Sequence, residues 1–118
     1  MQRVLLKAKI QKLTVTEANI DYEGSLSLDE ELMIAADMKP FEQVHVYNVS
    51  NGERFVTYLI KGAAGSGSVA VNGAAVHKAK MGDKLIVASY VNLEDQEIDF
   101  FVPKIILVDA KNHIKEAK

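Results

Sequence analysis

Residues 44–60 read VHVYNVSNGERFVTYLI and carry the strongest local pattern in the chain. Two runs rich in β-branched and aromatic residues flank Asn51-Gly52, a pair whose residues readily take the positive φ angles of a tight turn. The stretch therefore predicts two antiparallel strands joined by a short hairpin turn. A hairpin in the middle of the chain indicates a domain built around a β-sheet.

Further strand-like runs lie on both sides of this hairpin. KLIVASYV is the longest apolar run and is predicted to be a central strand. The other predicted strands are shorter, and the polar tail 111–118 is expected to fray. In chain order, the strands predicted outside the hairpin cover residues 4–10, 13–16, 84–91 and 104–108, with a short extended stretch ending at Tyr22.

One helix start is visible between the strands. Ser27 and Glu30 have the spacing of a capping box, which predicts a short helix through Leu32 and Ala36 that ends before Pro40. About seven strands with one or two short helices and closely spaced turns favour a small closed or nearly closed β-barrel. At 118 residues, the chain is predicted to form a single domain, residues 1–118.

Composition excludes several classes of function. A formal net charge of -2 provides no broad cationic surface, so neither nucleic acid nor an anionic membrane is an expected partner. The absence of cysteine excludes disulfides and thiolate chemistry. Lys7 and Lys9 interrupt the first apolar run, which therefore reads as neither a signal peptide nor a spanning helix, and a cytoplasmic location is expected.

Side-chain chemistry is sparse. His45, His77 and His113 are scattered without ligand-like spacing, so no metal site is expected. The loop GAAGSGS, 62–68, lacks the Lys-Ser or Lys-Thr that completes a P-loop. The acidic residues between positions 94 and 99 are expected to form a solvated face. An enzyme with this inventory that needs an electron sink must borrow a cofactor or make one.

The Gly24-Ser25 pair offers a way to make an electron sink from the chain itself. Most Gly-Ser pairs are simple turns. If the Ser25 hydroxyl attacks the Gly24 carbonyl, however, the peptide becomes an ester, and elimination with hydrolysis leaves a ketone on a new N-terminus. Glycine suits such a bond because it reaches strained backbone angles and leaves its carbonyl open to attack.

Four motifs occur together around this pair. They are Lys9, YEGS at 22–25, NVSNGERFVTYLI at 48–60 and VNGAA at 71–75. In this order and spacing the chain resembles the pyruvoyl-dependent aspartate 1-decarboxylase family over nearly its whole length. The resemblance implies a mainly β fold, a six-stranded double-psi β-barrel with one or two short helices. It also implies a homotetramer with active sites between neighbouring subunits.

The resemblance implies a self-processed enzyme. Cleavage between Gly24 and Ser25 would leave a β chain, 1–24, and an α chain, 25–118, that begins with a pyruvoyl group made from Ser25. This covalent cofactor would form a Schiff base with L-aspartate and accept electrons as the α-carboxylate leaves. The products would be CO2 and β-alanine for pantothenate and coenzyme A synthesis.

The family motifs also imply roles for individual residues. Arg54 would hold the side-chain carboxylate of the substrate, for which its planar fork is suited, and Lys9 would be a second cation. Tyr58 would return a proton to the carbon that lost CO2, and Thr57 would hydrogen-bond the Gly24 carbonyl during cleavage. The remaining implied positions are Asn72, Gly73, Ala74 and Ala75 as pocket lining, and Tyr22 and Glu23 beside the scissile bond.

Some points stay open at this level. Gln11 replaces a usual histidine of the family, and Tyr47 stands where tryptophan is frequent. Thr57 and Tyr58 would point to opposite faces of a regular strand, so either the strand is irregular or the two serve different protomers. Two other functions are compatible with the sequence: an uncleaved, non-enzymatic barrel that binds a small anion or protein, and a pyruvoyl decarboxylase for another amino acid.

Overall fold

The computed structural model describes residues 1–22 and 26–118. The predicted cleavage site, Gly24-Ser25, and the adjacent Glu23 therefore lie outside the described residues. The predicted mainly β class with short helices is confirmed. In chain order the strands are β1 (Gln2–Thr14), β2 (Glu17–Asn19), β3 (Leu26–Asp29), β4 (Gln43–Asn48), β5 (Arg54–Gly62), β6 (Val69–Asn72), β7 (Lys84–Glu94), β8 (Lys104–Val108) and β9 (Ile114–Ala117). The helices are α1 (Glu30–Ala35), the 3-10 helix η1 (Gly73–His77) and α2 (Asp95–Ile98).

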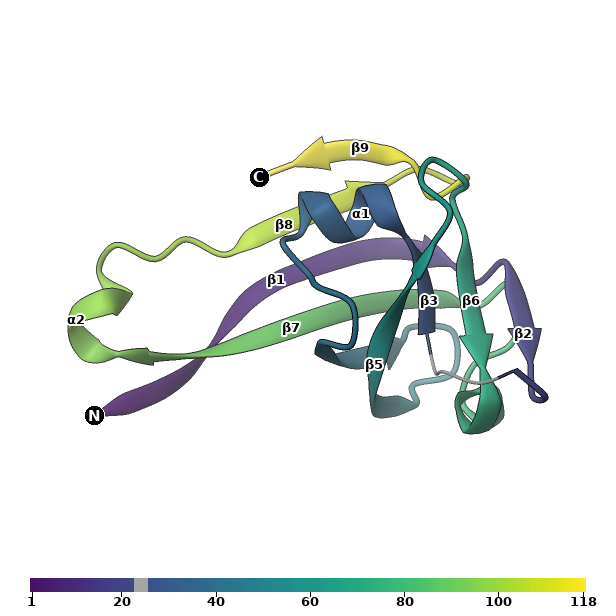
Figure 1. Cartoon of the computed structure of the whole chain (residues 1–118), viewed down its shortest axis with the longest axis horizontal. Coiled ribbons are helices and arrows are strands. Elements are labelled where there is room, and N and C mark those ends of the chain that lie inside the picture. The colour runs from purple at the N-terminus through teal and green to yellow at the C-terminus, as the bar shows by residue number, and fades with distance from the viewer. Residues whose placement is uncertain (23–25) are drawn as a thin grey trace.

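The strands form a strongly curved sheet in the order β2-β6-β3-β5-β4-β7-β1-β8-β9 (Figure 1). Strands β1 and β8, β2 and β6, and β3 and β5 run parallel, whereas the other neighbours are antiparallel. Beyond the end of β1, the Val15 amide donates to Asp83 O and the Thr16 amide donates to Val69 O, both at 2.9 Å. The first bond continues the contact with the β7 side, whereas the second joins the end of β1 to β6 near the opposite end of the sheet, an arrangement consistent with the expected double-psi barrel.

The core fills the inside of this curved sheet. Along β4 the buried residues alternate, with Val44 and Val46 fully covered and His45 and Tyr47 half-buried on the outer face. The predicted central strand β7 lies between β4 and β1 and contributes Leu85 to the core. The largest fully buried side chains come from most strands and from α1: Ile10, Leu13, Leu26, Leu28, Leu32, Met33, Leu59, Leu85 and Ile106. Burial of each stabilises the fold by about 1.5–3 kcal/mol before entropy is counted.

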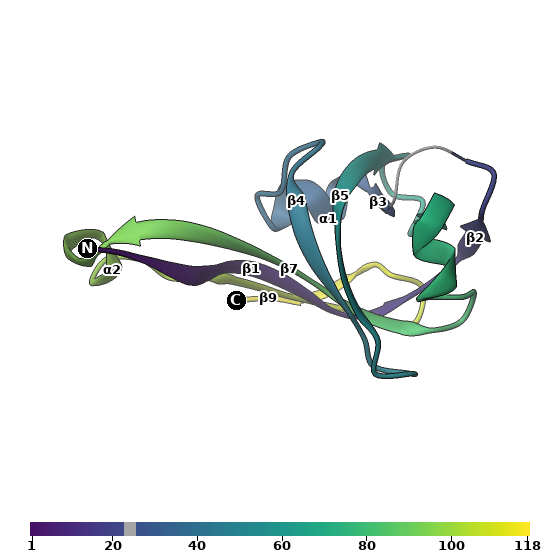
Figure 2. The ribbon, with the colours of Figure 1, turned by 90° about the horizontal axis from the view of Figure 1, so that it is seen from below.

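A two-stranded arm extends from the barrel. The first half of β1 and the second half of β7 project beyond the other strands, with α2 and the N-terminus at the tip (Figures 1 and 2). The molecule is therefore elongated, with extents of 44 × 27 × 24 Å. Val4, Phe100 and Val102 on or next to this arm are 70%, 88% and 78% exposed. Two-stranded ribbons are marginally stable alone, and these exposed apolar side chains add to the apolar surface of the arm.

The predicted start of the first helix is wrong. Asp29, not Ser27, is the N-cap of α1, and its Oδ1 accepts from the Glu31 amide at 2.9 Å. Ser27 instead lies inside β3, where it pairs with Ile60 of β5 and Ala70 of β6. Pairing on both sides of β3 overrides the local capping pattern, and the helix begins three residues after Ser27.

The hairpin turn is also longer than predicted. Asn48 N donates to Glu53 O and Gly52 N donates to Asn48 O, both at 2.8 Å, so residues 49–52 form the loop. Gly52 has a φ of +78°, whereas Asn51 is not among the positive-φ residues. Asn51 stabilises the turn differently, because its side-chain oxygen accepts from the Glu53 amide at 2.8 Å.

Two further boundaries differ from the expectation. Residues 4–16 do not divide into two strands, because β1 is continuous with a register shift between Ile10 and Leu13, and Lys12 takes a φ of +67°. The tail does not fray, since β9 pairs antiparallel with β8. Buried Asn112 anchors this end: its side chain exchanges two 2.8 Å hydrogen bonds with the Thr14 backbone and donates a third to Gly67 O.

Asp29 also organises the glycine-rich loop. Its buried carboxylate accepts from the Gly65 amide at 2.9 Å and the Gly67 amide at 2.8 Å in addition to the helix amide. The loop amides that could cradle a phosphate are thus used within the fold. A side chain at Gly67 would collide with the Lys111 carbonyl oxygen, so this close approach requires glycine.

We expect Asp29→Ala to destabilise the protein by about 2–4 kcal/mol, because it removes a helix cap and leaves buried amides without an acceptor. Urea denaturation followed by circular dichroism measures this loss. Asp99→Ala is the matched control, since Asp99 is exposed at the end of α2 and is expected to change stability by less than about 0.5 kcal/mol. Equal stabilities of the two variants would contradict the assigned role of Asp29.

Candidate active site

The strands before and after residues 23–25, β2 and β3, both pair with β6. On one side, β2 ends at Asn19, which pairs with Asn72. On the other, β3 begins at Leu26, which pairs with Val71, the residue before Asn72, and with Leu59 of β5. Tyr58 and Thr57 directly precede Leu59 on the parallel neighbour of β3. The start of β3 is therefore flanked by Thr57 and Tyr58 on one side and by Asn72 on the other.

Two oxygens at this place are buried without a hydrogen-bond partner among residues 1–22 and 26–118. They are the Thr57 Oγ1 and the Asn72 Oδ1. Buried polar atoms are nearly always paired in native proteins, so each such atom requires an explanation. Both belong to residues that the family motifs assign to the site, and both are suited to bind polar groups brought there by the chain or by a ligand.

Small residues open a cavity next to Thr57. After Asn72 the chain turns into η1 at Gly73, whose φ of +62° favours glycine. The turn brings Ala74 and Ala75 against β5, and together with Thr57 they border a cavity of about 180 Å³. Lys78 also borders it and is ion-paired with Glu53 at 2.8 Å. Two of the four predicted pocket residues, Ala74 and Ala75, thus border a cavity with Thr57. Asn72 and Gly73 directly precede them in the chain but do not border it.

Thr57 and Tyr58 lie on opposite faces of β5. The pairing with β4 runs from Tyr47 opposite Arg54 to Gln43 opposite Tyr58 without a register shift, so the strand is not bulged there. Thr57 is half-buried, whereas Arg54 and Tyr58 are exposed on the outer face. A bulge in β5 between Arg54 and Tyr58 is therefore excluded. One chain places Thr57 on one side of the strand and Arg54 with Tyr58 on the other.

Lys9 lies on the same outer face as Arg54. The register aligns Lys9 with Ala88, Ala88 with His45, and His45 with Val56, and partners opposite each other share a face. Arg54 is two residues before Val56 on β5. Three strand spacings of about 4.8 Å and two residues along β5 separate the two cations, so their backbones are roughly 16 Å apart along the sheet.

Both cations lack a counter-charge within residues 1–22 and 26–118. Neither Lys9 nor Arg54 takes part in an ion pair with any other residue of the described chain, in contrast to Lys7, which contacts Glu42 at 3.1 Å. Instead, the Arg54 guanidinium carbon lies 4.6 Å from the centroid of the Tyr47 ring. The outer face therefore offers positive charge that is available to an anion.

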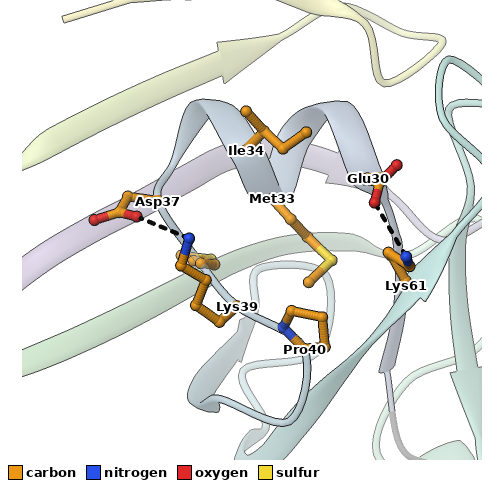
Figure 3. Close-up of a pocket in the computed structure, with 8 residues that line it drawn as sticks. Glu30, Met33, Ile34, Asp37, Lys39, Pro40 and Lys61 are labelled. Atoms are coloured by element: carbon orange, nitrogen blue, oxygen red, sulfur yellow. Dashed lines mark ion pairs between the residues drawn. The ribbon is translucent and has the colours of Figure 1, made fainter.

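A second cavity beside α1 is separate from this site. It has a volume of about 380 Å³ and is bordered by Met33, Ile34 and Pro40 among others (Figure 3). Charged residues at its rim neutralise one another, since Lys61 pairs with Glu30 at 3.3 Å and Lys39 pairs with Asp37 at 3.9 Å. None of the predicted site residues borders it.

Gln11 is remote from the cavity at Thr57. It lies on β1 opposite Leu107 of β8 and borders a shallow depression with Glu116 and Lys118.

Tyr90 lies on the same outer face of the sheet as Tyr47 and Arg54, and it was not identified from the sequence. The Tyr90 hydroxyl lies 2.6 Å from the Tyr47 hydroxyl. No local pattern marks Tyr90, because its contact depends on the long-range register of β4 and β7.

Two general searches give negative results for the described part of the chain. No group of three or more histidine, cysteine, aspartate or glutamate residues in it has the geometry of a metal site. No helix in residues 1–22 and 26–118 is both long and apolar enough to cross a membrane.

Comparison with known proteins places these features in a family. The fold and the site define a small β-barrel with a polar pocket at the start of β3. The profile described as aspartate decarboxylase matches residues 1–115. The aspartate 1-decarboxylase of Cupriavidus necator is 53% identical over 118 residues, 100% of this chain and 98% of that protein.

Two further relatives have the same name and full-length coverage. The aspartate 1-decarboxylase of Ralstonia nicotianae is 51% identical, covering 100% of this chain and 98% of that protein. That of Bordetella pertussis is 48% identical, with 100% and 97% covered. The chain belongs to the aspartate decarboxylase family, which confirms the resemblance carried by its four motifs.

Proposed function

We propose that this protein converts L-aspartate to β-alanine and CO2 after cutting its own chain between Gly24 and Ser25. The observation that carries the proposal is the position of β3. Its first described residue, Leu26, starts beside Thr57 and Asn72, each of which has a buried oxygen without a hydrogen-bond partner in residues 1–22 and 26–118. Consecutive Cα atoms are 3.8 Å apart, so a cofactor attached to the Leu26 amide would have these polar atoms within reach.

The chain's own residues are suited to the cleavage. The Ser25 hydroxyl oxygen would bond to the Gly24 carbonyl carbon while the Gly24–Ser25 C–N bond breaks, and the hydroxyl proton passes to the freed amine. Thr57 would donate its hydroxyl hydrogen to the oxygen that becomes negative as the attack proceeds. Removal of the Ser25 Cα proton with cleavage of the Cβ–O bond would release residues 1–24 with a C-terminal carboxylate and leave a Cα–Cβ double bond. Tautomerisation to the imine, addition of water and release of ammonia would then leave a pyruvoyl group.

The residues present fit such a group. Thr57 and Asn72 supply buried polar atoms, while Gly73, Ala74 and Ala75 leave room beside them. The group's conjugated carbonyl would supply the electron sink that side chains lack. Residues 1–24 would remain bound after the cut, because β1 pairs with both β7 and β8 and Asn112 holds its end.

The outer face is suited to bind and protonate the substrate. Arg54 would grip the side-chain carboxylate with two parallel hydrogen bonds. Lys9, set apart from it, would attract the substrate, which has two carboxylates and a net negative charge, over a longer distance. Tyr58, 40% exposed and next to Leu59 in the chain, would donate the proton that replaces the lost carboxylate.

The opposite orientations of Thr57 and Tyr58 support a site shared between subunits. One protomer would contribute Thr57 and the small-residue cavity, and its neighbour would contribute the outer face with Arg54. The exposed arm residues Val4, Phe100 and Val102 are suited to a subunit contact. We therefore propose the homotetramer implied by the family, with the β-alanine used in pantothenate and coenzyme A synthesis.

Intact mass spectrometry of the purified protein tests the cleavage. Two species are expected: residues 1–24, and residues 25–118 with an N-terminus that resists Edman degradation because it carries a ketone instead of an amine. A single uncut chain after prolonged incubation would favour the non-enzymatic barrel. Turnover of aspartate, glutamate and uncharged amino acids by the same material then tests the substrate, and preference for another amino acid would contradict the proposal.

A further inference from the structure

An aromatic cluster covers part of the outer face next to Arg54. The phenol oxygens of Tyr47 on β4 and Tyr90 on β7 are 2.6 Å apart, a short hydrogen bond in which either hydroxyl can donate. The His45 ring meets the Tyr90 ring edge-on, with 5.0 Å between centroids. The two tyrosines are thus tied together across two strands.

The sheet register explains why the hydroxyls meet. Tyr47 pairs with Ile86 and His45 pairs with Ala88, so Tyr90 lies two residues further along β7 on the same face. Ala88 has only a methyl side chain, which leaves space above it. It is nevertheless 1% exposed, so larger neighbouring side chains must cover it. The tyrosine rings can therefore lean along the strands toward each other.

Tyr47 in turn supports Arg54. These residues are direct cross-strand partners, and the guanidinium carbon lies 4.6 Å from the ring centroid, within the range of a cation–π contact. Arginine has many rotamers, and the conformational entropy that it loses on binding a ligand reduces affinity. A fixed ring beneath the guanidinium restricts the Arg54 side chain before the ligand binds, so less entropy is lost on binding.

We propose that Tyr90 is a positioning residue: its hydroxyl fixes the Tyr47 ring, which holds the Arg54 guanidinium ready for a substrate carboxylate. This inference rests on the proposed function, in which Arg54 binds that carboxylate. Tyr90 acts through Tyr47 and is not proposed to contact the substrate itself. Its effect is on binding and not on the chemical step, and the chain can be cut without it.

The titration of Tyr47 supports the contact. Burial raises the pKa of the Tyr47 phenol above its ordinary value, and the hydrogen bond with Tyr90 raises it further, while the nearby Arg54 charge lowers it. Replacing Tyr90 with phenylalanine removes both raising contributions of Tyr90 to the Tyr47 pKa, the hydrogen bond and the charge interaction. The Tyr47 phenol should then deprotonate at a lower pH than in the unaltered protein, which gives a readout independent of catalysis.

The test compares Tyr90→Phe, Tyr47→Phe and the double variant. Each single change is expected to raise the KM for aspartate and the Ki for succinate, a dicarboxylate without an amine, by about threefold to tenfold. Because both changes break the same hydrogen bond, the double variant should be no worse than Tyr47→Phe alone. The kcat and the extent of chain cleavage should stay unchanged. NMR of 13Cζ-labelled tyrosine should show the lowered Tyr47 pKa in Tyr90→Phe.

The outcomes separate this inference from the proposed function. An unchanged KM and Ki in Tyr90→Phe, additive effects in the double variant, or a fall in kcat at constant KM would each overturn the role of Tyr90. A protein that cleaves itself but does not decarboxylate aspartate would instead overturn the proposed function. Succinate binding and the Tyr47 titration remain measurable in that case, so the positioning role is still tested.

Discussion

Ser25→Ala is expected to give an uncut chain that releases no CO2 from aspartate above background, a loss of at least about a thousandfold. Alanine has no hydroxyl to attack the Gly24 carbonyl, so neither the new N-terminus nor its carbonyl group can form. Mass spectrometry should find one species with the mass of residues 1–118, and a CO2-release assay should find no turnover.

Ser27→Ala is the matched control, because it removes a second serine hydroxyl two residues away. Ser27 lies within β3 and is paired on both sides, so its variant should be cut and remain active. Release of CO2 from aspartate by the uncut Ser25→Ala protein would show that the electron sink arises in another way. The cleavage mechanism would then have to be abandoned.

Arg54→Ala is expected to be cut normally but to lose about 100-fold in kcat/KM for aspartate, since two charge-assisted hydrogen bonds to a carboxylate disappear. Arg54 is exposed on the outer face of β5, away from the Thr57 side, so the cleavage step should not require it. Steady-state kinetics on fully cleaved protein measures the loss.

The chain supplies a control of the same residue type. Arg3 on the projecting arm pairs with Asp95 at 2.6 Å, and Arg3→Ala should change kcat/KM by less than about twofold. If Arg54→Ala instead stayed uncut, Arg54 would belong to the cleavage machinery. If it kept full activity, another group would have to bind the carboxylate, and Lys9 would be the first candidate.

The elements predicted correctly share a strong local pattern. β7 was found because its apolar run is long, and the β4–β5 hairpin was found because two strand-like runs flank a turn pair. The helix start at Ser27 was wrong because β3 pairs on both sides with distant strands. The ordered tail was missed because β9 depends on β8 and on Asn112, whose bonds join residues up to 98 positions apart.

The sequence by itself determined the mainly β class, the family and the candidate bond at Gly24-Ser25, because these follow from local residue patterns and from motifs in a common order. Only the tertiary structure decided that Thr57 and Asn72 flank the start of β3, and that Arg54 rests on Tyr47 held by Tyr90. The physical reason is strand register. Side chains alternate between faces, so their neighbours are set by long-range pairing that no local pattern contains.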